Sequence, residues 1–155
     1  MSKYAVLLLV LLSSLCLVAA CKKPGYPEGF PKIHPIQLKV VENGTPVAGV
    51  RVKVHYSDQQ LSKWGTGGFT GSDGIVKPST RGFSGAPEGE GVFLVEKRDS
   101  PVKQDENGNY VAGNTENQLD DRFSDPDETP FKASIPKKQN GIIVIDLGSE
   151  TVSVE

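Results

Sequence analysis

Apolar and polar residues alternate with a period of two along much of the chain after residue 34. Ile36, Leu38 and Val40 alternate with Gln37 and Lys39. Successive side chains of a strand point to opposite faces, so this pattern predicts a strand with one buried face. Similar short apolar segments predict further strands at 50–56, 64–70, 75–76, 92–95, 131–135 and 141–147.

Turn signals separate these segments. Asn43-Gly44 is a dipeptide that accepts positive φ in a tight hairpin, and Ser72-Asp73-Gly74 predicts a second turn. No stretch has the apolar spacing of an amphipathic helix of useful length. Short strands without helical spacers predict an all-β fold over residues 34–155, an antiparallel Greek-key β-sandwich of about seven strands.

The first 33 residues follow a different pattern. Lys3, the apolar stretch Tyr4–Leu17 and the small residues Ala19-Ala20 have the three parts of a secretory signal, which predicts a signal peptide over residues 1–20. Residues 21–33 contain prolines spaced three or four apart, which blocks helix formation. We therefore expect a Pro-rich tether between the signal peptide and the β-sandwich domain.

The end of the signal, Leu17-Val18-Ala19-Ala20-Cys21, resembles the bacterial lipobox. This resemblance implies that Cys21 carries a diacylglyceryl group and anchors the chain to a membrane of the cell envelope. An ordinary signal peptide that leaves Cys21 as a free thiol is the alternative. Lys22 follows the cysteine where some bacteria place Asp to retain lipoproteins elsewhere, so the outer membrane is favoured, with the domain periplasmic or surface-exposed.

Charge and cysteine content exclude several classes of protein. Only Lys3 is charged ahead of Cys21, so the part from Cys21 onward has 16 basic and 19 acidic residues and a formal charge of −3. A nucleic-acid partner is not expected at this charge. The two cysteines, Cys16 and Cys21, leave no pair for an internal disulfide or a thiolate metal site. We expect a monomer without a cofactor.

Four motifs in order resemble small bacterial lipoproteins with a carboxypeptidase-regulatory-like, transthyretin-like β-sandwich domain. Asn43–Val52 is similar to that family's opening hairpin, and Thr70–Gly74 to its "T-D-x-x-G" turn. Gly85–Glu90 is similar to its "G-A-P-x-G-E" segment, although Gly91 follows where an aromatic residue is common. Arg122–Phe131 resembles its "D-P" segment. The resemblance implies a fold and a location in the cell envelope, and it implies no shared catalytic activity.

Neither histidine lies in a recognisable catalytic motif. A zinc carboxypeptidase needs a Glu three residues after its first His, whereas Gln37 follows His34 and Asp58 follows His55 at that spacing. We therefore expect a non-enzymatic, lipid-anchored cell-envelope protein that acts as a structural or protein-interaction module. The segment between Arg98 and Pro130 is the expected interaction surface, because loops carry recognition on a rigid scaffold.

The alternative function is a carbohydrate- or small-ligand-binding module. Trp64, Phe69 and Phe83 lie in a glycine-rich region and would form an aromatic platform for such a ligand. Possible partners are thus the membrane, through the anchor, and envelope proteins or glycans.

One acidic cluster is a candidate calcium site. Close carboxylates repel one another unless a cation or a basic neighbour joins them, and Arg122 and Lys132 are basic neighbours that offer the competing explanation. The candidate ligands are Asp120, Asp121, Asp125, Asp127 and Glu128.

Overall fold

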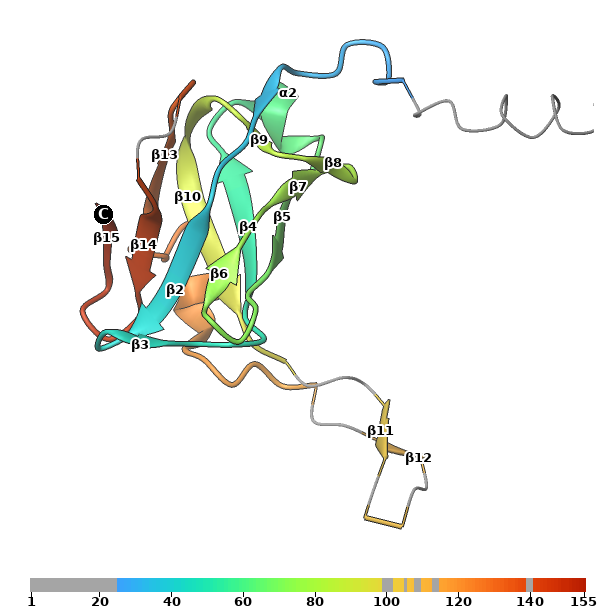
Figure 1. Cartoon of the computed structure of the whole chain (residues 1–155), viewed down its shortest axis with the longest axis vertical. Coiled ribbons are helices and arrows are strands. Elements are labelled where there is room, and N and C mark those ends of the chain that lie inside the picture. Colours follow the sequence, from blue (N-terminus) through green and yellow to red (C-terminus); the bar gives the residue numbers. More distant parts are fainter. Residues whose placement is uncertain (1–24, 99–101, 105, 108–109, 113–114, 139–140) are drawn as a thin grey trace, which may run out of the picture. The chain divides into compact units, whose positions relative to one another are not determined.

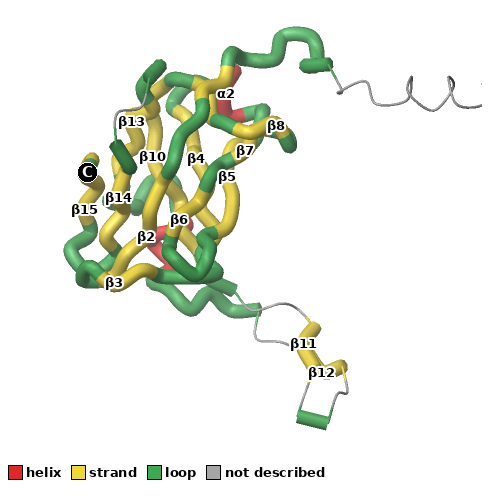
Figure 2. Tube along the Cα trace, viewed as in Figure 1, coloured by secondary structure: helices red, strands yellow, loops and turns green. Residues whose placement is uncertain are grey.

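Short strands are the main regular element of the described chain in this computed structural model (Figures 1 and 2). The structure describes residues 25–98, 102–104, 106–107, 110–112, 115–138 and 141–155. The chain divides into two compact units, Met1–Phe30 and Pro31–Glu155. The predicted signal peptide and Cys21 lie outside the described residues, and lipidation of Cys21 stays a prediction.

One sheet of the second unit has six strands in the order β13-β10-β4-β5-β7-β8, and every neighbouring pair is antiparallel. Its central strands are the longest, and β10 pairs with β4 over six residues from Gly91 opposite Tyr56 to Glu96 opposite Arg51. The strands are β4 (Arg51–Tyr56), β5 (Thr66–Phe69), β7 (Ser79–Thr80), β8 (Phe83–Ser84), β10 (Gly89–Glu96) and β13 (Lys132–Ile135).

The other sheet is mixed. Its strand order is β15-β14-β2-β3, and β6 also pairs with β2 beside Leu38 and Lys39. The pairing of β14 with β2 is parallel, with Ile145 opposite Val40, whereas the sequence analysis expected antiparallel strands throughout. The strands are β2 (Leu38–Glu42), β3 (Thr45–Pro46), β6 (Ile75–Val76), β14 (Ile143–Asp146) and β15 (Thr151–Val154).

The hydrophobic core contains the apolar faces of both sheets. In β4, Val52, Val54 and Tyr56 are buried while Arg51 and His55 are exposed, as the alternation predicts. Leu38 and Val40 of β2 and Ile143 and Ile145 of β14 belong to the same cluster of buried residues. The predicted all-β sandwich is therefore confirmed, and its core is largely aliphatic, as the composition indicates.

Smaller elements complete the second unit. A single helical turn, α2 (Gln59–Ser62), follows β4, and a 3-10 turn, η1 (Asp121–Ser124), precedes β13; neither is an amphipathic helix of useful length. Asp58 caps α2 by accepting the backbone N–H of Gln60 at 2.7 Å. Two further antiparallel pairs join β1 (Ile33–His34) to β9 (Ala86–Pro87) and β11 (Val102–Gln104) to β12 (Tyr110–Ala112).

Among its described residues, the segment between Arg98 and Pro130 contacts the core near its C-terminal end. Phe123 of η1 is buried, and its ring centroid lies 4.9 Å from that of Phe131. The segment is therefore held to the core through η1, close to the start of β13. Leu119 packs against the same core while remaining partly exposed.

The described part of the predicted tether has no regular strand or helix before β1. A turn is closed by the Phe30 N–H, which donates to the Pro27 carbonyl at 3.1 Å. The rings of Tyr26 and Phe30 stack with centroids 5.0 Å apart. Among the described residues, no helix is long and apolar enough to cross a membrane.

Candidate ligand-binding groove

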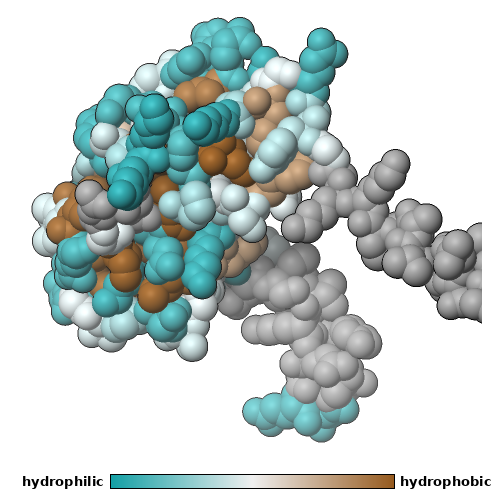
Figure 3. Space-filling model, turned by 45° about the horizontal axis from the view of Figure 1, so that its top comes forward, coloured by the Kyte–Doolittle hydropathy of each residue, from teal (hydrophilic) through white to brown (hydrophobic). Residues whose placement is uncertain are grey.

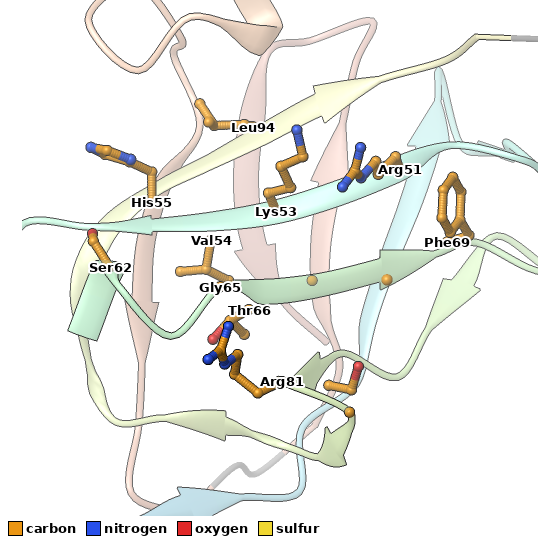
Figure 4. A pocket seen from close by; sticks show the side chains of 14 residues that line it. Arg51, Lys53, Val54, His55, Ser62, Gly65, Thr66, Phe69, Arg81 and Leu94 are labelled. Carbon is orange, nitrogen blue, oxygen red and sulfur yellow. The ribbon is translucent and has the colours of Figure 1, made fainter. Parts of the chain in front are cut away.

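The outer face of β4 carries charge. Alternation turns Arg51, Lys53 and His55 away from the buried valines, so their side chains lie on one side of the strand (Figure 4). Opposite this strand, Leu94 and Glu96 of β10 share the outward face by register. Glu96 Oε1 accepts from Arg51 Nη1 at 3.3 Å and lies 3.1 Å from Lys53 Nζ. The carboxylate thus holds both cationic side chains over the sheet.

Arg98 is a third basic partner of Glu96, with its Nε 3.2 Å from Oε2. Burial alone would raise the pKa of Glu96, but hydrogen bonds from Lys53 and Arg98 and the charges of Lys53 and Arg51 outweigh burial. The pKa of Glu96 is therefore lower than its ordinary value, and the carboxylate is ionised at neutral pH. One negative charge faces three positive ones.

The adjoining strand, β5, has glycine at its two central positions and therefore no side chains there. Gly67 of β5 lies opposite Lys53, and a Cβ at Gly67 would approach the Val52 carbonyl oxygen to 2.5 Å. No real Cβ tolerates that distance from backbone, so β4 and β5 approach closely only because residue 67 has no side chain. With Gly68 next to it, the middle of β5 presents backbone instead of side chains.

These elements form a groove of about 570 Å³. Its cationic residues are Arg51 and Lys53 on β4 and Arg81 in the turn between β7 and β8 (Figure 4). Phe69, at the end of β5, is 67% exposed and lies below Arg51, whose guanidinium carbon is 5.9 Å from the ring centroid. No Asp or Glu occurs among the described residues that line the groove.

The predicted aromatic platform is only partly gathered here. Phe69 lines the groove. Trp64 is not a lining residue, but its ring centroid lies 5.9 Å from the guanidinium carbon of Arg81, which lines the groove. Lys63 Nζ lies 5.4 Å from the same centroid. Phe83 pairs with Thr80 in the β7–β8 hairpin and is not a lining residue. A role for these aromatic residues in ligand binding stays a prediction.

The groove residues that the sequence analysis missed are its cations. The alternation already places Arg51 and Lys53 on the same outward face, and that pattern is a usable signal. Arg81 gives no such signal, because its position over β5 depends on the antiparallel pairing of Thr66 with Thr80. Arg81 has a positive φ of 52°, a conformation that the sequence does not reveal.

Carboxylates of the acidic cluster accept hydrogen bonds from residues close to them in sequence. Asp120 accepts the Arg122 backbone N–H at 3.1 Å and its guanidinium Nε at 2.9 Å, and these contacts lower the pKa of Asp120. Asp125 accepts the backbone N–H of Asp127 at 2.8 Å. Arg122 also pairs with Glu150 of the turn before β15. Arg122 is therefore the basic partner that the sequence offered as the alternative to calcium.

Among the described residues, no group of three His, Cys, Asp or Glu side chains is placed to hold a metal ion. The five carboxylates proposed for calcium are all described and do not form such a group; calcium binding there stays a prediction. The physical reason is the turn geometry, which directs Asp120 and Asp125 to nearby backbone N–H groups.

Hydrophilic and hydrophobic residues are interspersed on the face shown in Figure 3. Apolar atoms contribute more than half of a typical folded surface, so scattered hydrophobic residues of this kind need no partner. The groove, with its distinct charge and shape, is the stronger candidate for recognition.

Comparison of the chain with protein-family models, curated proteins and solved structures finds no match. The resemblance to carboxypeptidase-regulatory-like lipoproteins therefore rests on its four motifs. Two of them form the expected turns: Asn43 and Gly44 have φ of 51° and 82°, and Asp73 accepts the Ile75 N–H at 3.0 Å.

Proposed function

We propose that this chain is a lipid-anchored, non-enzymatic binding module of a bacterial cell envelope. Its anchor would be the diacylglyceryl group on Cys21, and the sandwich would present its binding surface at the end of the Pro-rich tether. The observation that supports binding is the groove on the outer face of β4 and β5, where three cationic residues and an exposed Phe69 surround bare backbone.

The groove favours the carbohydrate- or small-ligand-binding alternative over a purely structural role. It is open and has a rigid floor, because β5 is paired with β4 on one side and with β7 on the other. Two serines line it, Ser62 and Ser79, and Ser62 donates its hydroxyl proton to the Tyr56 carbonyl at 2.7 Å. The Ser62 hydroxyl is therefore engaged in holding α2 against β4.

Metabolic labelling with a clickable fatty acid tests the anchor. The wild type should be labelled and recovered with membranes, and Cys21→Ser should be unlabelled. Cys16→Ser is the matched control, because this cysteine lies inside the predicted signal peptide and should not alter labelling. Equal labelling of wild type and Cys21→Ser would exclude the lipoprotein. Hydrolase screening of the purified protein tests the non-enzymatic part, and turnover abolished by Ser62→Ala would contradict it.

A further inference from the structure

We infer that the groove binds an acidic oligosaccharide, a sugar chain that carries carboxylate groups. This inference rests on the proposed binding function and names its ligand class. Charge, aromatic exposure and the shape of the groove lead to it independently.

The charge of the groove is opposite to that of the chain. The full sequence has a formal charge of −2, whereas Arg51, Lys53 and Arg81 line the groove without a lining carboxylate among the described residues. Arg51 and Lys53 have side chains 48% and 42% exposed, so both can reach a ligand. Glu96 is 15% exposed and neutralises only part of this charge. An anion is the complementary ligand.

The aromatic residues add an apolar contact. The ring of Phe69 is 67% exposed at one end of the groove. Arg81 is the second cation that lies over an aromatic ring, with its guanidinium carbon 5.9 Å from the centroid of the Trp64 ring. A flat aromatic ring packs well against the face of a sugar ring that carries C–H groups, while Arg and Lys donate to sugar carboxylates. An acidic sugar combines the two features that these side chains recognise.

The shape of the groove favours a sugar chain over a peptide or a membrane. Extended peptides bind by adding a strand to a free sheet edge, but β4 lies between β10 and β5, and β5 is paired with β7 at Thr66 and Gly67. A membrane surface is matched by a protruding basic patch, whereas these cations surround a hollow floored by Gly67 and Gly68. A single chain of sugar rings fits such an open, bare-floored hollow.

Titration of the full-length protein in non-ionic detergent with a short oligogalacturonate tests the inference. Trp64 is the only tryptophan, so its fluorescence reports on the Arg81 end of the groove, and calorimetry gives the affinity. The methyl ester of the same oligosaccharide, in which each carboxylate is esterified with methanol, is the matched neutral ligand. We expect binding of the acid that weakens with salt, and at least tenfold weaker binding of the ester.

Variants then locate the site. Lys53→Gln and Arg81→Gln should each weaken binding by about three- to tenfold, since each removes one charge-assisted hydrogen bond. Lys39→Gln makes the same change on β2 of the mixed sheet and should leave affinity unchanged. Glu96→Gln should tighten binding about two- to threefold, because it removes the carboxylate that competes for Arg51 and Lys53. Unchanged melting temperatures would show that these effects do not arise from unfolding.

Equal binding of the acid and the ester, or equal loss in Lys39→Gln and Lys53→Gln, would overturn the inference. So would tighter binding of a phosphopeptide or of vesicles containing anionic lipid through Lys53 and Arg81. These outcomes are independent of the anchor: loss of fatty-acid labelling at Cys21 would remove the proposed envelope attachment and leave the sugar titration as it stands.

Discussion

The inner and outer faces of β4 differ in what their side chains contact. Val52 and Val54 face the mixed sheet and are buried in the common core. Arg51 and Lys53, one residue away, face outward and contact Glu96. The inner face gains stability from burial, while exposed ion pairs on the outer face contribute little to folding. One strand thus separates folding from recognition, and substitutions on its two faces should have separable effects.

The largest effect is expected from Val52→Asp. Val52 is fully buried between the sheets, and a carboxylate there would have no partner on the apolar face. We expect a loss of roughly 3 kcal/mol or more in the free energy of unfolding. Chemical denaturation measures it, with Lys53→Gln as the outward-facing control that should change stability by less than about 0.5 kcal/mol. Similar stabilities of the two variants would show that the faces are assigned wrongly.

Gly91→Ala probes the distance between β4 and β10. A Cβ at Gly91 would lie 2.1 Å from the His55 carbonyl oxygen, so β10 must shift away from β4 to admit it. We expect a loss of about 1–3 kcal/mol, the usual cost of overpacking. Gly25→Ala is the control, because a Cβ there meets nothing within 4 Å. A Gly91→Ala protein as stable as the control would contradict the close approach.

Tyr56→Phe tests the polar end of the inner face. The Tyr56 hydroxyl donates to the Pro87 carbonyl at 2.9 Å, and its loss should cost about 1 kcal/mol near neutral pH. Burial raises the pKa of Tyr56 from 10.0 to about 12.

The raised pKa means that the folded protein favours the neutral phenol. The stability that the neutral Tyr56 phenol contributes is fully present below pH 10 and is lost as the pH rises toward about 12. Denaturation of the wild type should therefore become easier over that range, and Tyr56→Phe should lack this component. Parallel alkaline profiles of the two proteins would contradict the burial of the hydroxyl.

The smallest effect is expected from Glu96→Gln on the outer face. The pKa of Glu96 is lowered in the folded state, so its contribution is present above the unfolded pKa and lost as pH falls through the folded one. Because its partners are largely solvated, we expect at most about 1 kcal/mol at neutral pH. Denaturation as a function of pH should show the difference from wild type vanishing in acid. A difference that grows in acid would contradict the assignment of the ion pairs.

The sequence predicts those parts of the fold that local periodicity determines. The alternation in 50–56 correctly separates buried from outward residues in β4, and Asn43-Gly44 correctly marks the turn between β2 and β3. It does not predict the parallel pairing of β14 with β2, because Ile143, Val144 and Ile145 are apolar in succession and carry no alternation. Strand partners far apart in sequence leave no local signal.

The groove was predictable only in part for the same reason. Phe69 and the outward position of Lys53 follow from the local pattern. The meeting of Lys53 with Gly67, and of Arg81 with Trp64, depends on the register between strands and on a turn with positive φ. A side chain at position 91 would meet the backbone of His55, a constraint that only the structure shows.

The parallel pairing of β2 with β14 also determines when the domain can finish folding. β2 is the first long strand to leave the ribosome, but its neighbour over Leu38 to Val41 is the segment Ile143–Asp146. Closing so large a loop is entropically costly and slows folding. Until Ile143–Asp146 has been synthesised, the apolar edge of β2 has no partner from β14, and the sandwich stays open. Nearly the whole chain must therefore be made before this part of the mixed sheet can form.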